Sequence, residues 1–418
     1  MNVDSILKEV VEEFKPGESE IKEIDEKLKA FLSKVKEEIK KSKIKAEVFV
    51  GGSYPKRTMM KSKEYDVDIF IRFTKKEGQN LSDLTEKLLK NFKKTRIHGS
   101  RDYFKIRIST RIVFEVVPVL KVRNPKEAEN ITDLSYFHVN YIRKKLKTEK
   151  ILNEVVIAKA FCHANNCYGA ESYIKGFSGY GIELLIQYYG TFLKFLKETS
   201  KAKEKIIIDV EKHYKNRQEV MMNVNSAKLN SPIILIDPTF KQRNALAALS
   251  EKTFEEFQKA AKEFLKKPNK RFFETKKINW EEIKKNATRK RLEFIILDVK
   301  TNRQEGDIAG TKLLKFYEYI TKEISKYFIV KNRGFEYNDG KTAKYFFVVE
   351  RKKELMFNGP KLNDIENIKK FKKKHKNAVI KNGRLYAKEK NQLDIRKFLQ
   401  NWEKRNKKLI LEMSTELV

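Results

Sequence analysis

Three acidic residues in apolar surroundings are the side chains of this sequence best suited to chemistry. Asp66 and Asp68 lie in the stretch YDVDIFIRF, and Glu115 is the only acid in RIVFEVVPV. A buried carboxylate is costly unless a cation meets it, so each of these needs a basic partner or a metal ion. On one face of a strand, Asp66 and Asp68 would lie about 7 Å apart, close enough to converge on one divalent ion. Mg²⁺ prefers carboxylate oxygens together with substrate phosphates.

A glycine-rich segment precedes the two aspartates. The residues 51–53 read Gly-Gly-Ser, and Pro55, Lys56 and Arg57 follow. Serine is a good N-cap and proline suits the first turn of a helix. The free N–H groups of a helix N-terminus bind phosphate, and the two basic side chains add positive charge. We therefore expect a helix here that begins after the glycines and offers its first turn to a triphosphate.

The spacing of apolar residues places the three acids on strands. In 65–73 the odd-numbered residues are apolar and form the core face, so Asp66 and Asp68 share the other face. In 111–119 the even-numbered residues form the core face, which leaves Glu115 pointing away from it. The segments 102–109 and 111–120 read as a hairpin, and 3–14 and 18–41 read as helices. The alternative is an exposed strand in which Glu115 merely pairs with a base such as Arg111.

The same patterns predict a multidomain α+β fold. Strands and helices mix in the first 120 residues, the pattern from about 133 to 197 is helical, and the last 140 residues return to mixed α/β. We expect three domains with soft boundaries, at 1–145, 146–260 and 261–418.

The charge balance favours a polyanionic partner. The 418 residues include 92 Lys and Arg against 57 Asp and Glu, which gives a formal net charge of +35. Nucleic acid is the first partner to expect and an anionic membrane surface the second. The alternative is a lysine-rich composition with solvated faces and no specific partner.

The cysteines and the apolar segments indicate the cellular setting. Cys162 and Cys167 are the only cysteines, too few for a disulfide scaffold or a cysteine-built zinc site. The N-terminus lacks the apolar stretch of a signal peptide, and the most apolar long segment, YGIELLIQYYGTFLKFL, is interrupted by Glu183, Gln187 and Lys194. We expect a cytoplasmic protein without a membrane partner.

Two sets of motifs resemble known families. The Gly-Ser followed about thirteen residues later by Asp-x-Asp resembles the signature of the nucleotidyltransferase superfamily that includes DNA polymerase beta. The segments VVIAKAFCHANNCYGAES, GFSGYGIELLIQYYG and DPTFKQRNALAALS resemble the archaeal (class I) CCA-adding enzyme, and the resemblance extends over nearly the whole chain. It implies a tRNA nucleotidyltransferase that builds or repairs the 3′ CCA end from CTP and ATP without a template. It implies a catalytic palm in 1–145, a helical neck that recognises the base in 146–260 and a tRNA-binding body and tail in 261–418. The family often dimerises, so a homodimer is among its implications.

The resemblance also implies a role for individual residues. Asp66, Asp68 and Glu115 fall on the catalytic, metal-binding carboxylates of the family, which hold Mg²⁺. The implied nucleotide-binding residues are Ser53, Lys56, His138, Lys159 and Tyr168, with Arg243 matching an arginine implicated in reading the base. Four of them have a structural alternative: a satisfied structural residue for His138 and Tyr168, a solvated helix position for Lys159, and pairing with Asp237 for Arg243. The chain departs from the family pattern in Lys56, often Arg, in Arg57, often Gly, and in Glu115, more commonly Asp.

The basic segment 371–390 is the predicted tRNA-binding surface. Lys372, Lys373 and Lys374 would contact the backbone of the acceptor and TΨC arm, and Tyr386 would stack. The alternative for this run is a solvated face.

Two other functions remain open on sequence grounds. A poly(A) polymerase or oligoadenylate synthetase-like enzyme would use the same palm with ATP alone. A non-enzymatic RNA-binding protein would carry a degenerate palm, against which the intact set of three acids argues. The mechanism we expect is two-metal-ion nucleotidyl transfer with release of pyrophosphate.

Overall fold

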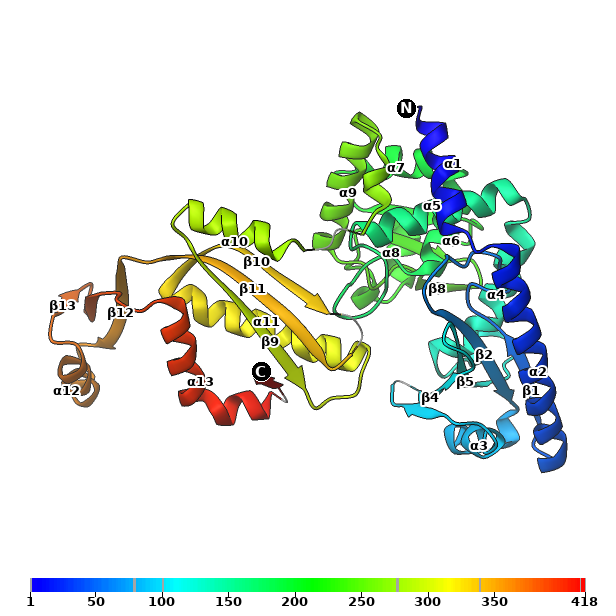
Figure 1. The fold of residues 1–418 in the computed structure, drawn as a ribbon, viewed down its shortest axis with the longest axis horizontal. Helices are drawn as coiled ribbons and strands as arrows, with labels where there is room; N and C mark the ends of the chain where they lie inside the picture. The colour runs from blue at the N-terminus through cyan, green and yellow to red at the C-terminus, as the bar shows by residue number, and fades with distance from the viewer. Residues whose placement is uncertain are drawn as a thin grey trace. The chain divides into compact units, whose positions relative to one another are not determined.

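The structure is a computed structural model that describes residues 2–77, 80–99, 101–275, 278–337, 340–413 and 415–417. The chain divides into two compact units, Met1–Lys276 and Lys277–Val418, whose helices and strands are labelled in Figure 1. Both units mix helices with sheets, which confirms the predicted multidomain α+β class. The predicted division near 260 falls inside helix α9, Glu251–Lys266, and the finer three-domain division remains a prediction.

A five-stranded mixed sheet forms the first part of unit 1. Its order is β1-β2-β5-β4-β3, with β2 and β5 parallel and the other pairs antiparallel. The strands are β1 Ala46–Val50, β2 Tyr65–Phe73, β3 Thr95–Ile97, β4 Tyr103–Arg107 and β5 Ile112–Leu120. The predicted hairpin of 102–109 with 111–120 is therefore confirmed, since β4 and β5 pair antiparallel.

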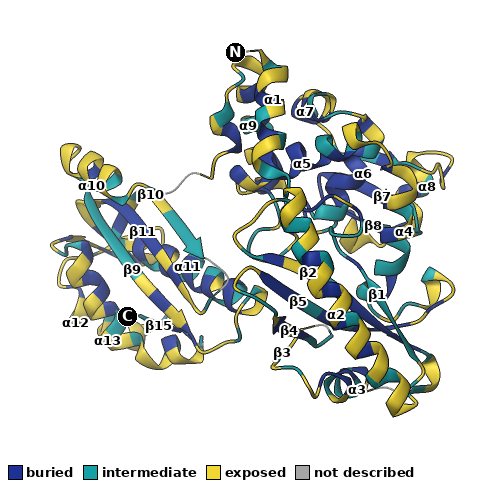
Figure 2. Cartoon of the chain, turned by 45° about the vertical axis from the view of Figure 1, so that its right-hand side comes forward, coloured by how far each residue is buried: buried dark blue, intermediate teal, exposed yellow. Residues whose placement is uncertain are grey.

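One face of this sheet is core and the other carries the acids. Helices α2, Glu18–Ser42, and α3, Leu81–Leu88, pack on the apolar face, where the odd-numbered residues of β2 are fully buried. Figure 2 shows the burial along β2 and β5, with the outer side of α2 exposed. The alternation read from the sequence is confirmed, because Asp66 is exposed and Asp68 half-buried on the opposite face.

The rest of unit 1 is mainly helical. Its helices are α1 Val3–Phe14, α4 Ser135–Lys145, α5 Glu149–Ala164, α6 Gly179–Tyr189, α7 Phe192–Ser200, α8 Arg217–Asn223 and α9. A core rich in phenylalanine joins α1, α5, α6, α7 and α9. A small sheet of β6 Ile206–Asp209, β7 Ile233–Asp237 and β8 Phe240–Asn244 completes the unit. In the part of the chain that the structure describes, no helix is both long enough and apolar enough to cross a membrane.

Unit 2 contains two sheets. The larger has the order β10-β11-β9-β15, with helices α11 and α13 in the core on one face and α10 over the other. Its elements are α10 Trp280–Arg289, β9 Glu293–Thr301, α11 Asp307–Tyr327, β10 Phe328–Tyr337, β11 Thr342–Arg351, α13 Ile395–Glu412 and β15 Thr415–Leu417. The smaller sheet is β12-β14-β13, formed by β12 Glu354–Lys361, β13 Ala378–Lys381 and β14 Arg384–Lys390, with helix α12, Ile365–Lys374.

Candidate active site

Asp68 and Glu115 lie side by side on neighbouring strands. They are directly paired across the parallel β2–β5 ladder, and Asp66 is two residues away from Asp68 on the same face. Adjacent strands are about 4.8 Å apart, so the ladder brings the predicted acids into one cluster. Burial, Glu115 and Asp66 together raise the pKa of Asp68 to about 7, with Lys56 opposing. The pattern read from sequence thus placed all three acids correctly.

Glu115 already has a cationic partner. Lys105 Nζ lies 2.9 Å from Glu115 Oε1, because Lys105 is the antiparallel partner of Glu115 on β4. Arg111, the base suggested by the sequence, pairs instead with Glu20, at 2.5 Å between Arg111 Nη2 and Glu20 Oε1. Across the described ranges, no three acidic, histidine or cysteine side chains form a ready-made metal-binding group. The donor chemistry still fits a divalent cation, since the raised pKa of Asp68 reflects crowded negative charge that a cation would relieve.

The segment after Gly51-Gly52 is a turn. The prediction of a helix there is wrong. Arg57 N donates to Tyr54 O at 3.0 Å and Thr58 N to Ser53 O at 3.1 Å, without a continuing helical ladder. Gly52 and Arg57 both have left-handed backbone angles, with φ of 65° and 59°, which a regular helix does not accommodate. Proline and serine therefore shape a tight turn here, which we call the 51–58 turn.

The 51–58 turn is pressed against Asp68. Gly51 N donates to Asp68 O at 2.8 Å, and a Cβ placed on Gly52 would lie 1.8 Å from Asp68 Oδ2. Only glycine fits at such a position, where φ is positive and an acidic side chain is in contact. The turn and the acids therefore form one continuous site.

Lys56 and Lys159 meet around a buried acid. Glu183 on α6 is fully buried, and its Oε2 lies 2.5 Å from Lys56 Nζ while its Oε1 lies 3.0 Å from Lys159 Nζ. Thr58 Oγ1 also donates to Glu183 Oε1, at 2.5 Å. Burial alone would raise the pKa of Glu183, but Lys159, Lys56 and the hydrogen bonds lower it to about 2. Both lysines are thus buried as charged partners of one carboxylate.

Tyr168 completes this side of the site. A Cβ placed on Gly179, the first residue of α6, would lie 3.0 Å from Tyr168 Oη and 3.7 Å from Lys159 Cε. Burial raises the pKa of the Tyr168 phenol, and the charges of Glu183 and Asp68 act in the same direction. The hydroxyl therefore stays protonated and can donate a hydrogen bond. The structure brings Tyr168 and Lys159 together, as expected for residues of one site.

His138 and Arg243 meet at Asp237. Asp237 Oδ2 lies 2.9 Å from His138 Nε2 and 2.6 Å from Arg243 Nη1, and its Oδ1 accepts from Tyr180 Oη at 3.1 Å. The ring of His138 stacks on Tyr180 with 4.2 Å between centroids. Burial would raise the pKa of Asp237, yet His138 and Arg243 hold it well below its usual range. The pairing of Arg243 with Asp237, left open by the sequence, is present.

Tyr180 lies between the group around Glu183 and the group around Asp237. Lys56 Nζ lies 5.9 Å from the centre of the Tyr180 ring and the Arg243 guanidinium 5.8 Å from it. Arg243 Nε is buried and has no hydrogen-bond partner among the described residues. Basic side chains paired with buried acids thus extend from the 51–58 turn to β8 within unit 1.

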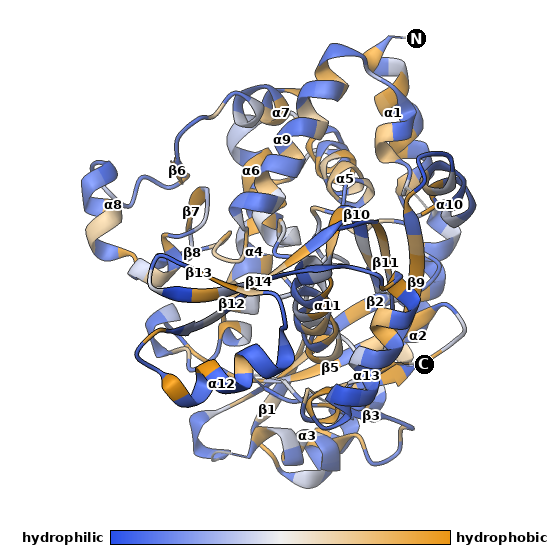
Figure 3. Cartoon of the chain, turned by 90° about the vertical axis from the view of Figure 1, so that its left-hand side faces the viewer, coloured by the Kyte–Doolittle hydropathy of each residue, from blue (hydrophilic) through white to orange (hydrophobic). Residues whose placement is uncertain are grey.

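The predicted tRNA-binding residues lie on opposite faces of the small sheet of unit 2. Lys372, Lys373 and Lys374 are exposed on α12. A Cβ placed on Gly359 of β12 would lie 2.9 Å from the Phe371 ring of α12 and 2.8 Å from Leu385 Cβ of β14, so α12 covers the face of the sheet that carries Leu385. Tyr386 alternates with Leu385 along β14, so it faces away from α12. Figure 3 shows hydrophilic residues predominating along α12 and β14.

The face around Tyr386 combines apolar and basic side chains. Tyr386 is paired with Asn358 on β12 and with Val379 on β13, and Met356 is paired with Lys388. Met356 is 63% and Val379 61% exposed, so uncovered apolar surface lies beside lysines. We call this the open face of the small sheet.

The sequence does not predict three residues of the site. Glu183 reads as an interruption of an apolar helix, Asp237 reads as a partner that would give Arg243 a structural role, and Thr58 belongs to no motif. The available signal was a charged residue in the otherwise apolar run YGIELLI, since a buried acid requires a cationic partner.

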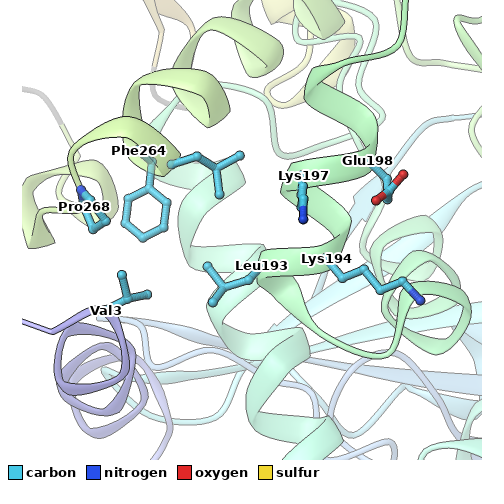
Figure 4. A pocket seen from close by; sticks show the side chains of 8 residues that line it. Val3, Leu193, Lys194, Lys197, Glu198, Phe264 and Pro268 are labelled. Carbon is cyan, nitrogen blue, oxygen red and sulfur yellow. The ribbon is translucent and has the colours of Figure 1, made fainter.

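A separate pocket of about 480 Å³ opens between α1, α7 and α9. Figure 4 shows Val3, Leu193, Phe264 and Pro268 around it, with Lys194 extending away. It contains none of the predicted site residues and is mainly apolar.

Comparison with known proteins points to one group. A family model described as tRNA nucleotidyltransferase, second domain, matches residues 153–274. A second, described as Second Messenger Oligonucleotide or Dinucleotide Synthetase domain, matches residues 1–136. The chain is 31% identical over 328 residues to a protein named CCA-adding enzyme from Saccharolobus islandicus, covering 77% of this chain and 72% of that protein.

Other relatives carry the same name. The protein from Methanocaldococcus jannaschii is 29% identical over 403 residues, covering 93% of this chain and 87% of that protein. The match to the protein from Nanoarchaeum equitans is 42% identical over 247 residues, covering 58% of this chain and 62% of that protein.

Solved structures share the fold. A cytoplasmic RNA terminal U-transferase aligns with a TM-score of 0.51 at 14% identity, covering 66% of this chain and 99% of that one. The Cid1 poly(U) polymerase aligns with a TM-score of 0.50 at 14% identity, covering 65% and 98%. At this identity the likeness establishes the fold alone.

Proposed function

This chain belongs to the family of CCA-adding enzymes, which are tRNA nucleotidyltransferases, and we propose that it adds and repairs the 3′-terminal CCA of tRNA from CTP and ATP. The observation that carries the proposal is the continuous site of three acids, a glycine turn and two buried lysines in a chain of this family. The acids suit nucleotidyl transfer and the cations suit a triphosphate.

Asp66, Asp68 and Glu115 would hold the divalent metal, Mg²⁺. When bound, the metal supplies Lewis acidity that activates the 3′-hydroxyl of the tRNA and stabilises the departing pyrophosphate. For this, Asp68 would be ionised, and the metal would compete for the Glu115 carboxylate with Lys105, which is paired with its Oε1 in this structure.

The remaining residues bind and orient the nucleotide. Lys56 lies in the 51–58 turn, paired with Glu183, and its ammonium suits the triphosphate. Ser53 and Tyr168 supply hydroxyl groups at the same site. His138 and Arg243, fixed by Asp237, would meet the sugar, the phosphates and the base. On unit 2, Tyr386 and the lysines 372–374 would contact the acceptor and TΨC arm of the tRNA.

Incubation of the protein with Mg²⁺ and tRNA that lacks its CCA end tests this proposal. We expect CTP alone to add C and stop, ATP alone to add nothing, and both together to restore CCA. Extension with ATP alone would identify a poly(A) polymerase-like or oligoadenylate synthetase-like enzyme instead. No extension with any nucleotide would favour a non-enzymatic RNA-binding protein.

The proposal includes a cytoplasmic setting and a homodimer. Cys162 and Cys167 are both buried free thiols, in keeping with a reducing compartment. Light scattering of the purified protein with and without tRNA would test the dimer.

A further inference from the structure

One buried carboxylate ties the 51–58 turn to two helices. Glu183 on α6 contacts Lys56 and Thr58 of the turn, at 2.5 Å each, and Lys159 of α5, at 3.0 Å. Glu183 and Thr58 are 0% exposed, Lys159 is 2% and Lys56 is 8% exposed. These four side chains, which we call the Glu183 cluster, therefore form a closed polar connection in an apolar environment.

The two lysines of the cluster are not equivalent. Lys159 Nζ donates to Thr58 O at 2.9 Å, to Thr58 Oγ1 at 3.1 Å and to Glu183 Oε1 at 3.0 Å. An ammonium has three N–H donors, so those of Lys159 are all in use. Lys56 Nζ has Glu183 Oε2 as its one hydrogen-bond acceptor among the described residues, which leaves two donors for a ligand. Lys159 is thus placed to hold the turn and Lys56 to meet the phosphates.

We propose that Glu183 is a positioning residue for nucleotide binding, which acts by fixing the 51–58 turn through Lys56, Thr58 and Lys159. The inference rests on the proposed function in taking a nucleoside triphosphate as the ligand of the turn. It assigns Lys159 to the support of the turn and not to the phosphates themselves. The carboxylate also leaves the two lysines with a net charge of one, which suits a polyanionic ligand.

Two conservative variants separate positioning from direct contact. Glu183→Gln keeps the shape of the side chain but removes the charge that balances two buried ammonium groups. Thr58→Val keeps the volume but removes the hydroxyl that joins Glu183 to Lys159. Because both side chains are fully buried, neither touches a nucleotide. Thr58→Val changes no charge, so its effect on nucleotide binding is transmitted through the turn, whereas Glu183→Gln also changes the charge beside Lys56.

The experiment measures the affinity of the full chain for inorganic tripolyphosphate and for CTP by calorimetry, with the melting temperature recorded for each variant. We expect both variants to bind about tenfold more weakly, as for the loss of a charged hydrogen bond. The double variant should be about as weak as either single one, because the residues act as one unit. Thr58→Ser, which keeps the hydroxyl, should bind normally.

The matched control is Glu154→Gln on the same helix as Lys159. Glu154 Oε2 accepts from Phe192 N at 2.7 Å and has no contact with the Glu183 cluster, so this variant should change the melting temperature without changing either affinity.

Two results would overturn the proposal. An affinity within about twofold of wild type in both variants, with a lower melting temperature, would make the cluster purely structural. Tighter binding by Glu183→Gln would make Glu183 a competitor of the phosphates. If Glu183→Gln does not fold, Thr58→Val decides alone. A wild-type protein that binds tripolyphosphate but adds no nucleotide to tRNA would refute the proposed function. The comparison of tripolyphosphate affinities between the variants and wild type would still test the role of Glu183.

Discussion

Burial and two neighbouring acids both raise the pKa of Asp68. The turn contacts it through Gly52, and Glu115 and Asp66 lie on the same face of the sheet. Its pKa near 7 means that much of it is protonated at neutral pH when no cation is near. A group so disposed is typical of sites that bind a cation, because the cation restores the charged form.

We expect Asp68→Asn and Asp66→Asn to abolish the addition of both C and A while leaving tRNA affinity near wild type. The reason is that the acids serve the metal and not the RNA. Single-turnover addition and filter binding measure the two quantities separately. Glu115→Asp is the control and should keep activity, since it retains the carboxylate. Near-normal turnover of either asparagine variant in Mg²⁺ would show that these acids are misassigned.

The ionisation of Glu183 should stabilise the fold above acidic pH. Its pKa is about 2 in the folded protein and 4.5 ordinarily, so its contribution is complete above pH 4.5 and is lost as pH falls toward 2. This contribution is worth up to about 3 kcal/mol of the free energy of unfolding. Denaturant titrations should therefore show the gap between wild type and Glu183→Gln shrinking below pH 4.5. A gap that stays constant with pH would contradict this.

Arg243 should govern the choice of base. A guanidinium can donate to the ring-nitrogen acceptor that cytosine and adenine share, but offers nothing to the ring N–H of uracil and guanine. We expect Arg243→Ala to lose discrimination against UTP and GTP by about 1–3 kcal/mol. This discrimination is measured by competition among the four nucleoside triphosphates for addition to tRNA that ends before the CCA. Unaltered selectivity with a lower melting temperature would leave Arg243 with a structural role at Asp237.

At the scale of elements, strands were predictable and the turn was not. Alternation of apolar residues determines which face of β2 and β5 is core, and that placed Asp66, Asp68 and Glu115 correctly. The 51–58 turn depends on the left-handed angles at Gly52 and Arg57 and on contacts with β2 and α6. Contacts between segments more than a hundred residues apart, such as Lys56 with Glu183, leave no local pattern in the sequence.

Gly52→Ala tests the fit between the turn and β2. The new methyl would collide with the Asp68 carboxylate and strain a positive φ. We expect a loss of stability of about 1–3 kcal/mol and a larger loss of nucleotide addition, measured by denaturation and by single-turnover assay. Gly190→Ala is the control, because φ is also positive there but no atom lies within 4 Å of the added methyl. Equal activity of the two variants would contradict the close fit.

At the scale of the whole molecule, the residues of the proposed chemistry all lie in Met1–Lys276, and those of the predicted tRNA grip lie in Lys277–Val418. The net charge of +35 is a property of the entire chain, so composition predicted a polyanionic partner without indicating which surface binds it. The opposite placement of α12 and Tyr386 could not be read from the segment 371–390, since it depends on the register of β14 with its neighbours.

The two faces of the small sheet should contribute differently to RNA binding. Changing Lys372, Lys373 and Lys374 to Ala should weaken binding and flatten its dependence on salt, because each phosphate contact releases counterions. Tyr386→Ala should weaken binding by about 1–3 kcal/mol without changing the salt slope, as expected for stacking. The control replaces the exposed Lys404, Lys407 and Lys408 of α13. If the triple α12 variant lowers the salt dependence of RNA affinity no more than this control does, the α12 lysines are solvated residues that do not contact the RNA.

The ion pair between Lys105 and Glu115 has a consequence for the protein in the absence of divalent ions. The Lys105 ammonium is held on the strand next to Glu115. It is therefore an intramolecular counter-ion, and its concentration near the carboxylate does not depend on the composition of the solvent. An ion that arrives from solution at Glu115 therefore exchanges one counter-charge for another, and the net gain is the difference between the two. Chelation should accordingly silence the enzyme and should lower the melting temperature less in wild type than in Lys105→Ala, since Lys105 keeps Glu115 paired when the ion leaves.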